Sequence, residues 1–384
     1  MKPMVRPRVT MFSSGPCTKR PGWSTAAIGD ALLGRSHRSQ IGKSRLREVI
    51  EKTAYLLRLP DDWRLGIVPG SDTGAFEMAM WSLLGARGVD VLVWENFGAG
   101  WAKNIEVELQ IPNSRVLEAD YGYIPDLSAV DFRSDVVFVW NGTTSGVRVP
   151  DGDWIPSDRE GLTLCDATSA VFAQELPWDK LDVVTFSWQK VLGGEAGHGM
   201  IVLSPRAIQR AESYIPKWPI PRIFRLTKNG KINAGLFQGE TINTPSMLCV
   251  EDALDALSWI ESIGGIAVAQ DRCNQNLEII ANWVSRSYWA DFLAVEVNTR
   301  SNTSICLKIV DPWFFKLEKK LQKKVPLKIE ELLEKEGSAY DVNGYREAPP
   351  GLRIWGGATV DAEDLNLLLP WLDWSYEEVK QALG

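Results

Sequence analysis

The chain contains a series of short apolar runs that are continuous rather than alternating, and this pattern constrains its fold more than any other feature. A strand that is exposed on one face alternates apolar and polar residues, whereas a strand that is buried on both faces does not. Strands buried on both faces belong to mainly parallel sheets covered by helices, so we predict an α/β protein. The runs lie at 65–68, 91–94, 115–118, 136–140, 162–165, 183–186 and 200–203.

Helical periodicity fills several of the gaps between these runs. Residues 45–57 place apolar side chains on one face, and Ser44 precedes them as the expected N-cap. Residues 75–84 are predicted to form a helix that stops at Gly85, and another helix is expected to begin near Ala99. Strands therefore alternate with helices, as in a parallel sheet built from crossover units.

The pattern changes after Pro245, where long helical segments replace the alternation. We expect the chain to divide into a large domain at 12–255 and a smaller α+β domain at 256–384, with residues 1–11 packed on the small domain. The elements predicted in the last third are helices at 247–263 and 266–288, a strand at 304–309, a lysine-rich helix at 312–324 and a strand at 352–355.

Charge and composition exclude several classes of protein. The formal net charge of −7 argues against a general nucleic-acid or anionic-membrane surface. The five cysteines form no CxxC pair and are odd in number, so reduced thiols in a cytoplasmic protein are the simplest interpretation. No stretch approaches the ~20 apolar residues of a membrane span, and no apolar segment of a signal peptide follows the basic N-terminus.

A lysine and an aspartate follow two neighbouring predicted strands. The run at 183–186 leads through Gln189 to Lys190, and the run at 162–165 ends in Asp166. A pyridoxal phosphate enzyme needs this pair, because the lysine amine joins the cofactor aldehyde and the acid pairs with the pyridinium nitrogen. Alone, either residue is more typical of an ordinary surface lysine or strand-end acid. The two together, with the motifs that follow, favour the cofactor.

Two further strand ends carry polar turns. Residues 69–74 lie between a strand and a helix, where free backbone N–H groups favour a phosphate, although the turn has neither a dinucleotide-binding nor a P-loop signature. Residues 141–146 follow another strand, and their hydroxyls could contact a cofactor or simply cap a turn. Trp101 opens the next helix and could stack on a ring or pack in the core.

Two arginine sites have the character of anion receptors. His37 and Arg38 precede the first helix, and Arg353 lies in an apolar, strand-like run. A buried arginine needs a partner, and a substrate carboxylate or an internal acid would each serve. The only two histidines, His37 and His198, lack the spacing of a metal site or of a hydrolytic triad, so no metal is expected.

Taken together, these residues resemble the phosphoserine aminotransferases, which belong to the class V, fold type I enzymes that use pyridoxal phosphate. The resemblance covers nearly the whole chain, from residue 12 to about residue 354. The chain departs from the commonest pattern at 71–74, where the family is richer in glycine and arginine, and at Tyr345, where many members carry histidine. The residues that carry the resemblance are Ser-Gly-Pro at 14–16, Ser-His-Arg at 36–38, Trp101, Asn-x-Thr at 141–143, Asp166, Gln189-Lys190 and Asn-Thr-Pro at 243–245.

The resemblance implies a reaction and a set of roles. Glutamate would give its amino group to 3-phosphohydroxypyruvate, yielding phosphoserine and 2-oxoglutarate in serine biosynthesis, with pyridoxine biosynthesis as a second possible pathway. Both substrates are small molecules, and the active unit would be a homodimer with shared sites. The implied roles are catalysis by Lys190 and Asp166; cofactor binding by Asp72, Thr73, Trp101, Thr143 and Gln189, with Asn243 and Thr244 of the partner subunit; and substrate binding by His37, Arg38, Arg346 and Arg353.

Other functions stay open at this point. A class V aminotransferase of the alanine–glyoxylate or serine–pyruvate type would keep Lys190 and Asp166 but need no phosphate receptor, so His37 and Arg38 argue against it. A cysteine desulfurase would need a nucleophilic cysteine on a mobile loop, whereas Cys306 lies in a strand-like run. A non-catalytic binding protein with the same fold would not need the lysine and the acid.

Overall fold

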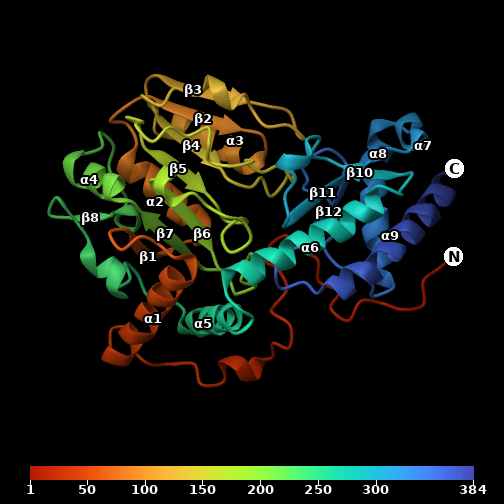
Figure 1. The fold of residues 1–384 in the computed structure, drawn as a ribbon, viewed down its shortest axis with the longest axis horizontal. Coiled ribbons are helices and arrows are strands. Elements are labelled where there is room, and N and C mark those ends of the chain that lie inside the picture. The colour runs from red at the N-terminus through yellow and green to blue at the C-terminus, as the bar shows by residue number, and fades with distance from the viewer.

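The computed structural model describes all 384 residues, and Figure 1 shows its fold. The α-helices are α1 (Gln40–Leu57), α2 (Ser71–Leu83), α3 (Asn96–Lys103), α4 (Pro205–Ser213), α5 (Met247–Ser262), α6 (Ile266–Val284), α7 (Pro312–Lys316), α8 (Lys319–Lys335) and α9 (Ala362–Leu383). The strands are β1 (Arg64–Pro69), β2 (Val89–Val93), β3 (Ser114–Glu118), β4 (Asp135–Val139), β5 (Thr163–Asp166), β6 (Val183–Ser187), β7 (His198–Leu203), β8 (Thr227–Lys228), β9 (Lys231–Ile232), β10 (Ala290–Phe292), β11 (Ser304–Ile309) and β12 (Gly351–Trp355).

The first seven strands form one sheet in the order β1-β7-β6-β5-β4-β2-β3. Strands β2 to β6 all run parallel to one another, whereas β7 is antiparallel to both of its neighbours, β1 and β6. The prediction of an α/β fold with a mainly parallel sheet is therefore confirmed. Because β1 and β6 both run against β7, six of the seven strands end at the same edge of the sheet.

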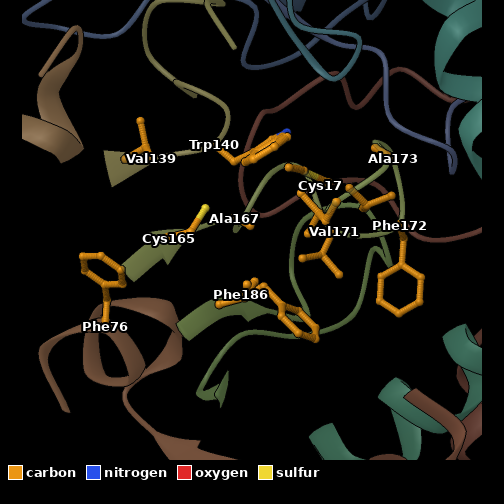
Figure 2. Close-up of a cluster of buried hydrophobic side chains, with 14 of the residues drawn as sticks. Cys17, Phe76, Val139, Trp140, Cys165, Ala167, Val171, Phe172, Ala173 and Phe186 are labelled. Carbon is orange, nitrogen blue, oxygen red and sulfur yellow. The ribbon is translucent and has the colours of Figure 1, made fainter. Parts of the chain in front are cut away.

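The continuous apolar runs are explained by burial on both faces of this sheet. Every residue of β4, β5 and β6 is buried. Figure 2 shows Val139, Cys165 and Phe186 on these three strands, with Phe76 of α2 facing them. Helix α2 packs on β1, β5, β6 and β7, and α3 packs on β2 and β4. The burial of these apolar side chains, worth about 1.5–3 kcal/mol for each large one, holds the strand ends in place.

A second, antiparallel sheet of β10, β11 and β12 forms in the last third of the chain. Figure 1 shows α6 running from the large sheet to this small one, with α9 beside it. The N-terminal segment lies against α9, where the backbone oxygen of Val5 accepts from the Trp371 indole at 2.8 Å and Arg8 N donates to Asp364 Oδ1 at 2.7 Å. The division into domains at residue 255 stays a prediction.

Helix starts were predicted too late in three places, one of which is α3, which begins at Asn96 rather than near Ala99. Helix α1 begins five residues before the predicted residue 45, because the side chain of Ser39, not that of Ser44, accepts the N–H of Gly42 at 3.2 Å. Helix α2 begins at Ser71 rather than at residue 75, so the polar turn itself forms the first turn of the helix. Polar residues at a helix start carry no apolar periodicity, and a pattern based on periodicity misses them.

The predicted lysine-rich helix at 312–324 is wrong in its bounds. Two helices occupy this region, since α7 ends at Lys316 and α8 begins at Lys319. Helix α8 then continues through Pro326 to Lys335. Proline is usually a helix breaker, yet Pro326 lies inside α8. None of the helices in the structure combines the length and apolar character of a membrane span.

Candidate active site

The strand ends of the large sheet meet around one cavity of about 110 Å³. Parallel strands place their carboxyl ends at a common edge, which is where open α/β sheets bind ligands. Seven of the predicted site residues come together here from five segments of the chain. The lining residues are Ser71, Asp72, Thr73, Glu95, Phe97, Trp101, Val139, Asn141, Thr143, Asp166, Thr168, Gln189 and Lys190.

Lys190 is buried in the turn after β6, and its Nζ donates a hydrogen bond to the backbone oxygen of Ser14. Burial disfavours the charged ammonium and lowers the pKa of Lys190, and the positive charge of Arg353 acts in the same direction. Gly15 beside it has a φ of +150°, a backbone conformation that favours glycine, and a Cβ at that position would lie 2.3 Å from the Lys190 Nζ. The N-terminal Gly-Pro segment thus closes over a buried amine whose pKa is lowered.

Asp166 is the last residue of β5, and its carboxylate is held from two directions. Oδ2 accepts from the indole Nε1 of Trp101 at 3.2 Å, and Oδ1 accepts from the backbone N–H of Thr168 at 3.1 Å. The Trp101 ring lies against Phe76, with ring centroids 4.8 Å apart. The carboxylate therefore has a fixed position at the cavity wall, while Trp101 both packs in the core and lines the cavity.

A hydrogen-bond network joins the turn after β4 to the small sheet. Asn141 Nδ2 donates to Ser169 Oγ at 2.8 Å, and the same Ser169 Oγ lies 2.9 Å from Thr143 Oγ1. The backbone oxygen of Thr143 accepts from Ser304 Oγ at 2.6 Å and from Arg353 Nη1 at 3.4 Å. Residues of β11 and β12 are thus tied to the cavity wall.

Arg353 has no acidic partner in the chain. Its guanidinium carbon lies 5.6 Å from the centroid of the Tyr345 ring, and its buried Nε has no hydrogen-bond partner. Its one side-chain hydrogen bond runs to the backbone oxygen of Thr143. Of the two partners that the sequence left open, the structure shows no internal acid, so an external carboxylate is the one that fits.

Other predicted residues lie apart from the Lys190 cavity. His37 and Arg38 line a separate cavity of about 170 Å³ with the segment 239–241. Asn243 and Thr244 follow that segment and are exposed. The structure of one chain therefore gathers two groups of residues, one around Lys190 and one around His37.

Arg346 also lies outside the cavity, in an exposed position. Its Nε forms an ion pair of 2.7 Å with Glu347, and 81% of its side chain is accessible. The chain itself does not bring Arg346 to Lys190, although its guanidinium, like that of Arg353, lies over the Tyr345 ring.

The cavity around Lys190 fits pyridoxal phosphate. Three polar atoms at its wall are buried without a partner, and such atoms call for a ligand or water. The N-terminal N–H groups of α2 can receive a phosphate, and Gly74 lets the turn tighten, since a Cβ there would lie 2.1 Å from the Pro69 oxygen. The unpartnered atoms are Asp72 Oδ1, Thr168 Oγ1 and Gln189 Oε1.

Comparison with known proteins decides the family. The chain is 58% identical over 380 residues to a phosphoserine aminotransferase of Methanosarcina barkeri, which covers 99% of this chain and 100% of that one. The chain belongs to the phosphoserine aminotransferase family. No family model matches the sequence.

Solved structures of phosphoserine aminotransferases have the same fold. That of Cytophaga hutchinsonii superposes with a TM-score of 0.82 at 20% identity, covering 95% of this chain and 98% of that one. The pyridoxal phosphate-bound enzyme of Trichomonas vaginalis gives a TM-score of 0.76 at 16% identity, with 94% and 99% covered. The resemblance seen in the sequence and the fold type I architecture are thereby confirmed.

Sequence reasoning did not find every residue at this site of the phosphoserine aminotransferase fold. Glu95 lines the cavity and accepts from Gly98 N and Thr144 Oγ1, both at 2.8 Å. Burial raises the pKa of Glu95 to about 7. Its signal was present, because Glu95 follows a buried strand as Asp166 does, but the predicted helix start near Ala99 hid its role as an N-cap. Thr168, two residues after Asp166, was missed as well.

Proposed function

We propose that this protein is a pyridoxal phosphate-dependent transaminase that moves the amino group of L-glutamate to 3-phosphohydroxypyruvate, giving O-phospho-L-serine and 2-oxoglutarate. The main support for this proposal is that a buried lysine, Lys190, and a fixed carboxylate, Asp166, line one cavity in a chain of this family. The activity requires both groups, since the lysine handles protons and the cofactor aldehyde while the acid faces the cofactor ring.

Residues of the cavity wall are assigned to the cofactor by their chemistry. Asp166 suits the ring nitrogen, and the Thr143 hydroxyl suits the ring oxygen. Backbone N–H groups of Asp72 and Thr73 at the start of α2, with the Gln189 side chain, suit the phosphate. Bound pyridoxal phosphate supplies an electron sink that stabilises the charge left when the substrate loses its α-proton.

Lys190 is the group that moves this proton. It must accept a proton as a base and return it as an acid, which works best when its pKa lies nearer to the working pH than that of a free lysine. Burial lowers the pKa of Lys190 in this direction.

Arg353 is assigned to the α-carboxylate that both substrates carry. Its planar fork matches a carboxylate with two parallel hydrogen bonds. The Tyr345 ring beneath the guanidinium and the bond to Thr143 hold the fork in orientation. Its buried, unpartnered Nε gives the ligand a donor that no group of the chain uses.

The second group of residues is assigned to a neighbouring site in a homodimer. His37 and Arg38 line a cavity with the segment that leads to Asn243 and Thr244, and both pairs lie apart from Lys190 of the same chain. Under two-fold symmetry, one such segment can reach the partner's cavity while the partner's segment reaches back. There Asn243 and Thr244 would complete the cofactor phosphate site, and His37 and Arg38 would face the substrate phosphate.

Arg346 is proposed as an additional contact of the substrate phosphate. It shares the Tyr345 ring with Arg353, and its ion pair with Glu347 is exposed and therefore weak. A substrate phosphate with about two negative charges could draw the guanidinium away from that pair.

A substrate panel tests the proposed function. The protein with pyridoxal phosphate is incubated with glutamate and 2-oxo acids that differ only by a phosphate group, and 2-oxoglutarate release is measured. We expect 3-phosphohydroxypyruvate to be used at least tenfold better in kcat/KM than hydroxypyruvate, because one charge-assisted contact to the phosphate contributes about 1.5–3 kcal/mol. Equal use of the two would instead support a general class V aminotransferase, and no turnover of any member would contradict an enzymatic role.

A further inference from the structure

A second cavity, of about 420 Å³, is lined by residues of α6 and of the segments 148–152, 173–177 and 300–302. Trp140 and Ala173, both labelled in Figure 2, also belong to its wall. It shares no lining residue with the Lys190 cavity. Its volume falls in the range of sites that bind small molecules, and its wall is mostly polar, so a small polar ligand is the kind that it fits.

Two arginines of this wall have no acidic partner. The Arg148 side chain donates only to backbone oxygens, at 3.2 Å to that of Arg300 and at 3.4 Å to that of Pro150. The Arg300 guanidinium carbon lies 4.1 Å from the centroid of the Phe292 ring, and its buried Nε has no hydrogen-bond partner. The indole Nε1 of Trp140 is a further buried donor without a partner. Such a set of cations and donors suits a carboxylate.

The same wall carries acceptors. Gln174 is only 6% exposed, and its Nε2 donates to Asn141 Oδ1 at 3.1 Å and to Asn302 Oδ1 at 2.9 Å. These two bonds fix the amide, while its buried Oε1 has no partner and calls for a donor. Asp151 and Glu175 are exposed at the same cavity, and neither forms an ion pair. An ammonium group would be stabilised by these acceptors, whereas a purely anionic ligand such as phosphate would be repelled by the two carboxylates.

We propose that this cavity binds a free α-amino acid as a zwitterion. The carboxylate of the amino acid would lie on Arg148 and Arg300, and its ammonium group would face Gln174 and the two acidic side chains. The site is distinct from the one in which Arg353 is assigned to the substrate carboxylate. Neither Lys190 nor the cofactor takes part, so the inference does not rest on the proposed transamination.

Isothermal titration calorimetry of the protein with its cofactor tests the binding. Alanine, serine, asparagine and glutamine are titrated one at a time, and the visible cofactor band is recorded to detect any amino acid that reaches the active site. We expect at least one of them to bind with a Kd below about 1 mM while the cofactor band stays unchanged. If none of the four binds at concentrations up to about 10 mM, the proposal is overturned.

Matched ligands test the chemical class. The amino acid that binds is compared with the carboxylic acid that lacks only its ammonium group, such as propionate for alanine, and with inorganic phosphate. Each should bind at least about tenfold more weakly, because the contacts of the ammonium group are lost. If either one binds as tightly as the amino acid, the cavity does not recognise a zwitterion and the proposal is wrong.

Variants test the location. Arg300→Gln removes a charged donor and should raise the Kd of the amino acid about tenfold or more. Trp140→Phe keeps the apolar ring but loses the N–H, so it should raise the Kd severalfold. Arg353→Ala alters the proposed substrate site and should leave this Kd unchanged, as should Arg87→Gln, the matched surface variant.

Melting temperatures show which variants are folded, and Trp140→Phe decides the location if Arg300→Gln is not. Wild-type affinity in the folded cavity variants would overturn the proposal. A loss of binding in Arg353→Ala would place the amino acid in the active site and would overturn it as well. Because calorimetry measures binding rather than turnover, a protein without transaminase activity would contradict the proposed function and leave this test intact.

Discussion

Arg353 of the small sheet donates a hydrogen bond of 3.4 Å to the backbone oxygen of Thr143, in the turn that follows β4 of the large sheet. The contact joins the residue assigned to the substrate carboxylate to a residue assigned to the cofactor. At this length the hydrogen bond is weak, so it helps to orient the guanidinium without compensating its charge. A substrate carboxylate would therefore meet an arginine that is oriented but not neutralised.

Replacing Arg353 and Arg38 should separate the two half-reactions. Arg353→Ala should reduce both, because glutamate and 3-phosphohydroxypyruvate each present an α-carboxylate. Arg38→Ala should reduce kcat/KM for the phosphorylated substrate by roughly 10- to 150-fold and affect glutamate less, since the lost contact serves the phosphate. Single-turnover rates with each substrate check the comparison. Arg87→Ala is the control, because Arg87 pairs with Glu160 at the surface. If Arg38→Ala slows the glutamate half-reaction as much as the half-reaction with the phosphorylated substrate, Arg38 does not bind the substrate phosphate.

Lys190→Ala should abolish turnover and the visible absorption of the lysine-bound cofactor. No other lysine lines the cavity, so no neighbouring amine can replace it. Absorption spectra and a glutamate half-reaction assay measure the two effects. Lys180→Ala is the matched control, because Lys180 precedes β6 at the opposite edge of the sheet and its amine bonds only to the Ser157 hydroxyl. A Lys190→Ala protein with wild-type rates would show that the assignment is wrong.

Mixed dimers should regain activity if the two groups of residues meet across subunits. One chain carries Lys190→Ala and is inactive, and the other carries Arg38→Ala and is strongly impaired with the phosphorylated substrate. In a mixed dimer, one cavity combines an intact Lys190 with an intact Arg38 from the partner, so refolding an equal mixture should restore about a quarter of wild-type activity. Each variant refolded alone is the control. If the mixture is no more active than the two variants separately, the groups do not share a site.

The sequence was informative wherever one residue type meets a strong local requirement. Lys190 and Asp166 follow buried strands, and parallel strands bring their ends together, so their proximity could be predicted. Contacts that depend on the direction of a side chain could not be predicted from the sequence. Nothing local in the sequence shows that Glu95 turns toward the cavity.

Local sequence patterns also could not predict which residue caps a helix or which residues meet in the assembled protein. Ser39 and Ser44 are equally good N-cap residues by type, and only the fold selects Ser39. The separation of His37 from Lys190 reflects long-range geometry and, in our proposal, a second chain. Residue type thus predicted which chemistry is present, while tertiary structure decided which groups meet.

His198 should make the protein less stable as the pH falls from about 6.5 to about 4. Its ring packs on Trp188 with centroids 4.9 Å apart, and its Nε2 accepts the N–H of Ser246 at 3.2 Å, which requires the neutral form. Burial lowers the pKa of His198 to about 4, whereas an unfolded histidine titrates near 6.5. Between these values the unfolded chain binds a proton that the native protein does not, so acid favours unfolding by up to about 3 kcal/mol.

The comparison of two histidine variants isolates this effect, because the chain contains only His37 and His198. His198→Gln keeps a side-chain acceptor for Ser246 but cannot be protonated, so the acid-dependent loss should shrink in this variant. The measurement is the urea midpoint of the cofactor-free protein at pH 7.5 and at pH 5, at one protein concentration because a dimer's stability depends on it. His37→Gln is the control, since His37 is less buried than His198 and its ring makes no hydrogen bond at Nε2. If His198→Gln loses as much stability between the two pH values as wild type, another buried group carries the acid sensitivity and the neutral His198 does not hold the Ser246 segment in place.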